Sequence, residues 1–319
     1  MTKNESLCRV ESASSKLTAC LYLSTIFIRS TQAEPFIGQF ELKTLESASG
    51  MFEFQSQNAW AWDHPARRFD SGPADELVFD ENSIFRERYA LELEIGFSEF
   101  LKMRVGVEAE RERIDEPHSP QQASDFDGLS LQEIGAEIVA ILLRRESADF
   151  GLGVVAEIEG PLDQEEPSHL TLGPIIEYQS GDWLIAAVPM LVHSFGGERD
   201  ENEWRDDKWD FAYAAQVMRT LSDRWSIALE GYGTVERLGS SGNRSLAANY
   251  FGDSNQHRLG PVVYFSRATE GGASGPGSSQ LTGETEEDGA ELTIGLGVLE
   301  GLNSHTADHT LKLSFEVDF

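Results

Sequence analysis

The chain has 319 residues and a formal net charge of −30, with 25 lysines and arginines against 55 aspartates and glutamates. This balance argues against nucleic-acid binding, which needs clustered basic side chains, and against an anionic inner-leaflet surface. The sequence has no run of about 18 apolar residues, which excludes a membrane-spanning helix.

The N-terminus is predicted to be an export signal. Leu17–Ile28 is an apolar stretch of signal-peptide length, basic residues precede it, and Thr31–Ala33 gives a small-x-small cleavage pattern. We therefore expect residues 1–33 to be a signal peptide, with a buried N-terminal element as the alternative. Cleavage would remove both cysteines, Cys8 and Cys20, so we expect no disulfide and no cysteine-ligated metal in the mature chain.

Beyond residue 50, strand-like segments follow one another with almost no helical period. Apolar residues such as Leu91, Leu93 and Ile95 alternate with polar ones, which places them on one face of a strand. Most segments have about ten to fourteen residues, the length of a tilted strand that crosses a bilayer. The twelve predicted strands are 51–62, 84–97, 100–111, 130–143, 149–159, 169–179, 182–193, 208–220, 224–236, 257–266, 290–299 and 309–319.

The connections between these segments alternate in length. Short ones follow Phe97, Arg145, Gln179 and Leu221. Transmembrane β-barrels show this asymmetry, with tight periplasmic turns and longer outer loops. The longer polar connections lie at 63–83, 112–129, 160–168, 194–207 and 237–256.

Aromatic residues gather on the apolar parity beside the short turns. This position is typical of a girdle at the membrane interface. The last strand alternates regularly and ends the chain on Phe319, and an even number of strands returns both chain ends to the periplasm. The predicted periplasmic girdle consists of Phe97, Phe150, Tyr178, Trp183, Trp225, Phe265 and Phe319.

The fold expected from these patterns is all-β: an antiparallel transmembrane β-barrel of about 12 strands, preceded by the signal peptide. The barrel would span residues 34–319, with 34–50 as a periplasmic or lumenal N-terminal segment. The Gly/Ser/Glu-rich stretch 268–289 is expected to be a flexible insert, with a strand count wrong by one as the alternative.

Two features depart from a simple barrel strand. Pro174 and Pro261 occur in repeated Leu-Gly-Pro segments, and Pro189 also falls inside a strand, so we expect a repeated bulge at the Leu-Gly-Pro segments. Residues 182–192 are apolar on both parities. We expect something to cover their inward face, with the stretch 36–45 as the candidate.

Several segments together resemble proteobacterial outer-membrane β-barrels. They are FELKTL at Phe40–Leu45, the run Arg86–Glu108, the two Leu-Gly-Pro strands and the ending LKLSFEVDF. The resemblance covers residues 36–319 apart from 268–289. It includes similarity to the transporters of the phenol-degradation (meta) pathway. It implies the outer membrane of a Gram-negative bacterium and the passage of small molecules, and it supplies no catalytic residues.

The polar parity of the strands carries many acidic residues against few basic ones. Charged rings bias ion entry into a pore, so the sequence predicts a passive channel or transporter for small solutes with a cation-favouring lumen. The alternative is a structural or interaction barrel with a blocked lumen. The acidic residues expected to line it are Glu92, Glu94, Glu108, Glu110, Glu137, Glu157, Glu159, Glu177, Glu230, Glu291 and Glu316.

No enzymatic, metal or cofactor site is predicted. His193 and Ser194 are neighbours, but adjacent strand residues point to opposite faces, and no histidine spacing fits a metal site. The expected partners are outer-membrane lipids and lipopolysaccharide, small solutes, and the barrel-assembly machinery, which would read the C-terminal strand. We expect no nucleic-acid partner.

Overall fold

A computed structural model describes residues 40, 42–62, 68–70, 77–79, 83–114, 128–145, 149–162, 167–196, 207–235, 238, 241, 256–268, 290–303 and 306–319. The predicted signal peptide and residues 269–289 of the predicted insert lie outside these residues. Among the described residues, no helix has the length and apolar character needed to cross a membrane.

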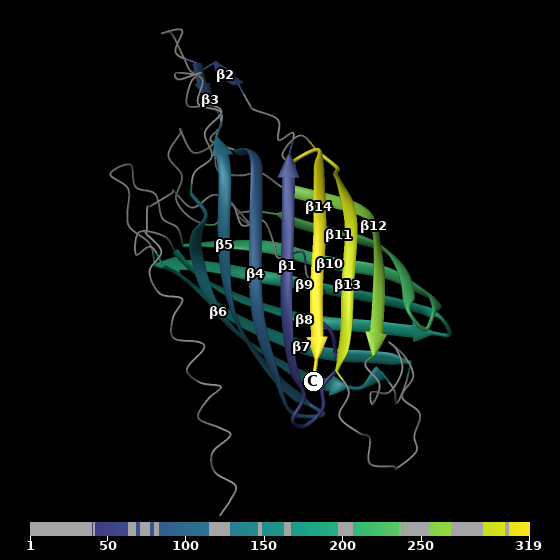
Figure 1. Cartoon of the computed structure of the whole chain (residues 1–319). Helices are drawn as coiled ribbons and strands as arrows, with labels where there is room; N and C mark the ends of the chain where they lie inside the picture. Colours follow the sequence, from purple (N-terminus) through teal and green to yellow (C-terminus); the bar gives the residue numbers. More distant parts are fainter. Residues whose placement is uncertain are drawn as a thin grey trace, which may run out of the picture. The chain divides into compact units, whose positions relative to one another are not determined.

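Twelve antiparallel strands form a closed barrel, in which each strand pairs with its neighbour in the chain and the last pairs with the first (Figure 1). All twelve predicted segments are strands, so the predicted fold class is confirmed. The strands are β1 (Phe52–Trp62), β4 (Ser83–Ser98), β5 (Leu101–Ile114), β6 (Ser130–Leu143), β7 (Phe150–Pro161), β8 (Pro167–Ser180), β9 (Trp183–Gly196), β10 (Lys208–Ser222), β11 (Trp225–Val235), β12 (Gln256–Ala268), β13 (Glu291–Gly301) and β14 (His309–Asp318).

A separate two-stranded sheet interrupts the connection that we predicted as a loop at 63–83. β2 (Arg68–Asp70) pairs with β3 (Leu77–Phe79) in antiparallel register. Strands of three residues are too short to show an alternating pattern, which is why the sequence did not predict them. Ala268 is a second small correction, because it ends β12 rather than beginning the insert.

The tight turns lie at one end of the barrel, beside the C-terminus (Figure 1). Two residues each connect β4 to β5, β8 to β9 and β10 to β11. In the β8–β9 turn, Gly181 has φ +57°, a backbone conformation that glycine adopts without steric cost. This end corresponds to the periplasmic side of the sequence-based prediction.

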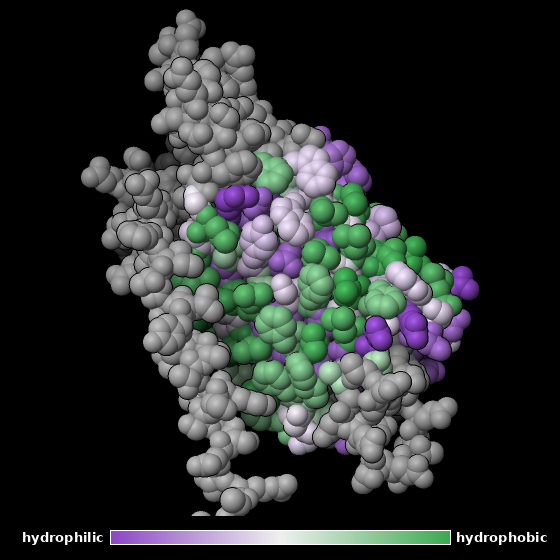
Figure 2. Space-filling model, viewed as in Figure 1, coloured by the Kyte–Doolittle hydropathy of each residue, from purple (hydrophilic) through white to green (hydrophobic). Residues whose placement is uncertain are grey.

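The barrel wall separates apolar from polar side chains. In β4, Leu91 and Leu93 are exposed on the outer surface, whereas Glu92 and Glu94 are buried inside. Figure 2 shows the apolar residues as a broad area on the face that contains β1, β13 and β14. Apolar side chains outside and polar ones inside are the arrangement of a barrel surrounded by lipid.

The prolines within strands open the hydrogen-bond ladder without changing its register. Leu172 pairs with Leu191 and Ile176 pairs with Ala187, which is the same register on both sides of Pro174. The second Leu-Gly-Pro segment, in β12, also keeps its register. A bulge would insert an extra residue and shift the register, so the predicted bulges are wrong. Proline lacks an N–H group, and pairing is lost only around it.

Candidate functional site

Of the residues that precede β1, the described ones at 40 and 42–48 lie inside the barrel. We call residue 40 and residues 42–48 the lumenal segment. At the short-turn end of the barrel, the hydroxyl of Ser47 donates to the carbonyl of Ser98 at 2.7 Å, and the N–H of Gly50 donates to the carbonyl of Gly96 at 2.8 Å. From this rim the chain runs into the lumen, where Phe40 is buried against residues of β1, β10, β11, β12 and β13.

Leu45 of the lumenal segment packs into a notch in the wall. Its side chain lies in a buried cluster with Val139, Ile141, Val155, Ile175 and Val188. Gly151 and Gly153 of β7 form the notch, because a Cβ on either glycine would collide with the Leu45 methyl groups. The wall is therefore shaped around this leucine.

The apolar inner face of β9 is covered as the sequence led us to expect. Val188 belongs to the same buried cluster as Leu45, and Leu42 and Met190 pack against that cluster. Of the stretch 36–45 that we expected there, residues 36–39 and 41 lie outside the described residues.

Phe40 makes the deepest described contact of the lumenal segment. Its ring meets Tyr232 edge to face, with 5.5 Å between ring centroids. The guanidinium of Arg258 lies 5.1 Å from the centre of the Phe40 ring. Ala59, Val262 and other small or aliphatic residues complete this cluster, so an apolar anchor holds the segment at each end.

Lys43 lies between these two anchors and faces the acidic wall. Its ammonium forms ion pairs with Glu137 and, at 3.5 Å, with Glu157. Lys43 is buried, whereas its neighbours Thr44 and Glu46 are exposed. Both also contact the wall, because the Thr44 hydroxyl accepts from Lys102 at 3.3 Å and Glu46 pairs with Arg145 at 2.7 Å.

The structure places the eleven acidic residues of the sequence analysis on the inner parity of their strands. Eight of them are buried: Glu92, Glu94, Glu108, Glu137, Glu157, Glu159, Glu177 and Glu230. Glu110, Glu291 and Glu316 are half-buried.

Basic side chains neutralise part of this acidic wall. Arg104 contacts Glu94 at 2.8 Å and Glu92 at 3.3 Å, and Lys102 contacts Glu94 at 3.0 Å. Further pairs are Arg86 with Glu110, Arg88 with Glu108, and Arg145 with Glu177. Lys43 and Arg145 were not predicted as partners, because sequence alone does not show which inner residues meet across the lumen.

Glu230 belongs to a satisfied network on the opposite wall. Lys312 and Tyr232 donate to its carboxylate at 2.8 Å and 2.6 Å, Gln216 donates at 2.9 Å, and Tyr264 is a fourth donor. A buried carboxylate with this many donors is a structural element. The acidic side chains that line a cavity lie instead on the β4–β7 side.

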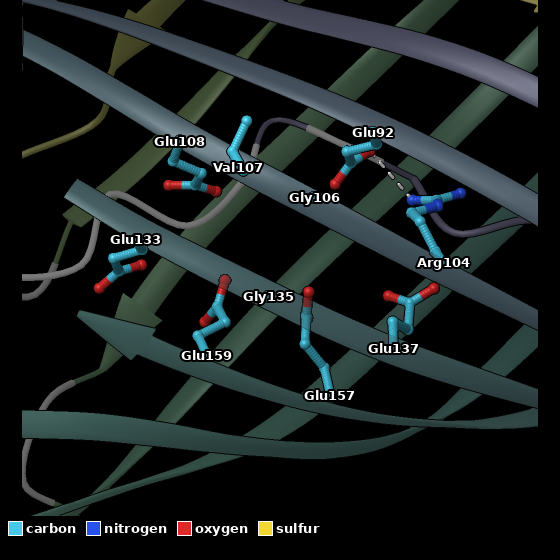
Figure 3. A pocket seen from close by; sticks show the side chains of 10 residues that line it. All are labelled: Glu92, Arg104, Gly106, Val107, Glu108, Glu133, Gly135, Glu137, Glu157 and Glu159. Atoms are coloured by element: carbon cyan, nitrogen blue, oxygen red, sulfur yellow. Dashed lines mark hydrogen bonds and ion pairs between the residues drawn. The ribbon is translucent and has the colours of Figure 1, made fainter. Parts of the chain in front are cut away.

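A cavity on the β4–β7 side is lined mainly by carboxylates (Figure 3). It measures about 10 Å³, close to the room that one water molecule needs. The carboxylates come from four neighbouring strands and point into the same space. Its lining residues are Glu92, Arg104, Gly106, Val107, Glu108, Glu133, Gly135, Glu137, Glu157 and Glu159. Glu133 is an addition to the residues that the sequence analysis singled out.

Ser194 meets a histidine that the sequence analysis did not pair with it. His169 Nδ1 lies 3.1 Å from Ser194 Oγ, and His169 Nε2 lies 3.8 Å from Glu133 Oε1. The order serine, histidine, carboxylate resembles a hydrolase triad. Ser194 is 0% exposed, however, and a nucleophile must reach its substrate. In this structure the Ser194 hydroxyl is therefore closed off from a substrate.

Three carboxylates near the C-terminus approach one another. Oxygen atoms of Glu53, Glu316 and Asp318 lie within 4.8 Å of one another. No metal site was predicted from the sequence. This group follows from strand pairing, because Glu53 lies opposite Asp318 in the β1–β14 ladder. A cation of suitable size fits this spacing, but the grouping needs none to explain it.

The predicted aromatic girdle residues lie on the outer parity at the short-turn end. Trp225 and Phe265 are in contact, with 4.9 Å between ring centroids, and Phe319 contacts Phe52 at 6.0 Å. Phe97, Phe150, Tyr178, Trp183, Trp225 and Phe319 are exposed, and Phe265 is half-buried.

A second group of outward aromatic residues lies toward the other end of the strands. Trp60 contacts Tyr89 at 6.0 Å, and His193 stacks on Trp209 at 4.4 Å. This group was not predicted from the sequence, although its members occupy the apolar parity of their strands. Two aromatic bands are typical of barrels that span a bilayer.

Comparison with solved structures agrees with this architecture. An outer membrane channel from Pseudomonas putida F1 matches with a TM-score of 0.54 at 12% identity, covering 90% of this chain and 100% of the other. The chain has the fold of an outer-membrane β-barrel. The NanC porin also matches, with a TM-score of 0.47 at 7% identity over 83% of this chain and 98% of the porin. No family model and no curated protein matches the sequence.

Proposed function

We propose that this protein is an outer-membrane channel of a Gram-negative bacterium that lets small solutes pass through an acidic, cation-favouring lumen. The main observation behind this proposal is the carboxylate-lined cavity beside the lumenal segment. Six glutamates and one arginine line it. Fixed negative charges along a narrow path favour cation entry and oppose anion entry.

The lumenal segment limits the size of what can pass. A barrel of this strand number leaves a small interior, well below the open channel of 16-stranded porins. Lys43 and Leu45 occupy part of that interior, whereas Thr44 and Glu46 remain exposed beside them. We propose that the path beside them admits inorganic ions and small polar molecules. The resemblance to phenol-pathway transporters suggests small organic solutes as a further class.

Reconstitution into planar bilayers tests the proposal. We expect discrete conductance steps and, under a salt gradient, a reversal potential that indicates cation preference. Glu133→Gln combined with Glu159→Gln should reduce that preference, whereas Glu99→Gln, in an exposed periplasmic turn, should not. A folded protein that prefers anions, or that never conducts, would overturn the proposal.

A structural barrel with a blocked lumen is the second candidate. The contacts of Phe40, Lys43 and Leu45 favour it, because they fix the lumenal segment across the interior. Deleting residues 40–46 separates the two candidates. A channel should conduct before and after the deletion, whereas a blocked barrel should be silent with the segment in place.

The C-terminal strand is proposed to be the signal for the barrel-assembly machinery, and the outer surface to contact lipids and lipopolysaccharide. Phe319 is 63% exposed, and its N–H donates to the carbonyl of Phe52 at 2.9 Å. The terminal ring is thus accessible while its backbone is fixed. Removing Phe319 should lower the amount of assembled barrel in outer membranes, and unchanged assembly would contradict this role.

A further inference from the structure

Lys43 brings a positive charge from the N-terminal segment into the acidic side of the lumen. It is 4% exposed and contacts Glu137, itself 2% exposed, and Glu157. Both glutamates also line the cavity between β4 and β7. The carboxylates that would attract a permeating cation are therefore already in contact with an alkylammonium group.

The neighbours of Lys43 hold this ammonium in place. On one side, the Leu45 N–H donates to Glu177 at 2.9 Å and the Leu45 side chain fills the glycine notch. On the same side, Lys102 donates to the Thr44 hydroxyl at 3.3 Å. On the other side, Phe40 packs against Tyr232. Lys43 thus acts as a tethered cation whose position is fixed by residues other than itself.

We propose that Lys43 determines the ion selectivity of the lumen, because it occupies a recognition site for primary alkylammonium ions at Glu137 and Glu157. This inference rests on the proposed channel function. While Lys43 is in place, it cancels part of the negative charge that a passing cation meets. Without it, two buried carboxylates lose their ammonium partner, and a cation from solution replaces it.

The expected size of the effect follows from electrostatics. A unit charge at about 4 Å contributes about 1 kcal/mol in a water-like medium, which corresponds to about a fivefold change in cation occupancy. Lys43 and Glu137 are buried, which strengthens their interaction. Lys43→Ala should therefore raise the ratio of K⁺ to Cl⁻ permeability at least about fivefold. Lys43→Arg keeps the charge and should retain the wild-type ratio.

Chemical rescue provides the sharpest test. The n-butylammonium ion has the length and the charge of a lysine side chain. Added to Lys43→Ala in planar bilayers, it should reduce the K⁺ current and return the permeability ratio toward the wild-type value. Tetramethylammonium has the same charge without a primary amine and should be a poorer blocker. Arg144→Ala is the matched control, because this arginine lies in a periplasmic turn paired with the exposed Glu99.

The outcomes separate this inference from the channel function. Heat-modifiable gel migration first establishes that each variant is folded. If Lys43→Ala conducts with an unchanged permeability ratio and without n-butylammonium block, the role of Lys43 is wrong and the channel function stands. If the wild type and every folded variant are silent, both are wrong. A fivefold shift reversed by n-butylammonium supports both.

Discussion

The backbone N–H of Leu45 donates a hydrogen bond of 2.9 Å to the carboxylate of Glu177, which lies 132 residues further along the chain. The same carboxylate contacts Arg145 at 2.8 Å, and Arg145 contacts Glu46 at 2.7 Å. The wall therefore binds the lumenal segment at two adjacent residues. The lumenal segment is therefore an integral part of the lumen, and its removal should change the conductance of the channel.

The glycine notch should be sensitive to added volume. A Cβ at Gly153 would collide with Leu45, whereas a Cβ at Gly160 in the same strand would meet no atom within 4 Å. Gly153→Val should displace the lumenal segment, increase single-channel conductance and destabilise the barrel by about 1–3 kcal/mol. Gly160→Val is the control. Equal behaviour of the two variants, in conductance and in thermal unfolding, would contradict the packing described here.

The pair of Glu230 and Lys312 should show strong coupling. Both side chains are buried and their charged atoms are 2.8 Å apart. Removing one partner leaves a buried charge, so Glu230→Gln or Lys312→Met should each cost about 3–5 kcal/mol of unfolding free energy. The double variant should cost much less than the sum. A double-mutant cycle in urea measures this, and additive losses would show that the two groups do not interact.

The outward-facing apolar positions of the strands should tolerate a charged side chain poorly. Leu296 is 53% exposed in β13 on the apolar outer surface. Leu296→Arg should destabilise insertion by about 2–4 kcal/mol if this residue lies near the bilayer midplane. Leu302→Arg, just beyond the strand at another exposed leucine, is the control and should cost little. Folding into lipid vesicles under urea measures both, and equal small costs would place Leu296 outside the lipid.

The barrel was predicted mainly from the alternation of apolar and polar residues along each strand. Leu292, Ile294 and Leu296 point outward from β13 as their parity indicates, and the predicted strand 290–299 differs from Glu291–Gly301 by one or two residues at its ends. A period of two decides the face of each side chain and therefore which residues face the lumen. The lengths of the connections then indicated which end of the barrel would face the periplasm.

The contacts across the lumen could not be predicted in this way. Periodicity places Glu137 and Glu157 on the inner face, but it does not indicate that Lys43, about a hundred positions earlier, lies between them. Such a contact depends on the path of a segment without regular structure. The ladder openings at Pro174 were missed for a related reason, because proline indicates a lost hydrogen bond without indicating whether the register shifts.

The central claim is that the acidic lumen conducts cations past the lumenal segment. The most direct test is the reversal potential of the wild-type protein in a planar bilayer under a tenfold KCl gradient, compared with a variant that lacks residues 40–46. We predict cation preference in both proteins and a larger conductance in the deletion variant. Anion preference, or silence of both folded proteins, would contradict the account.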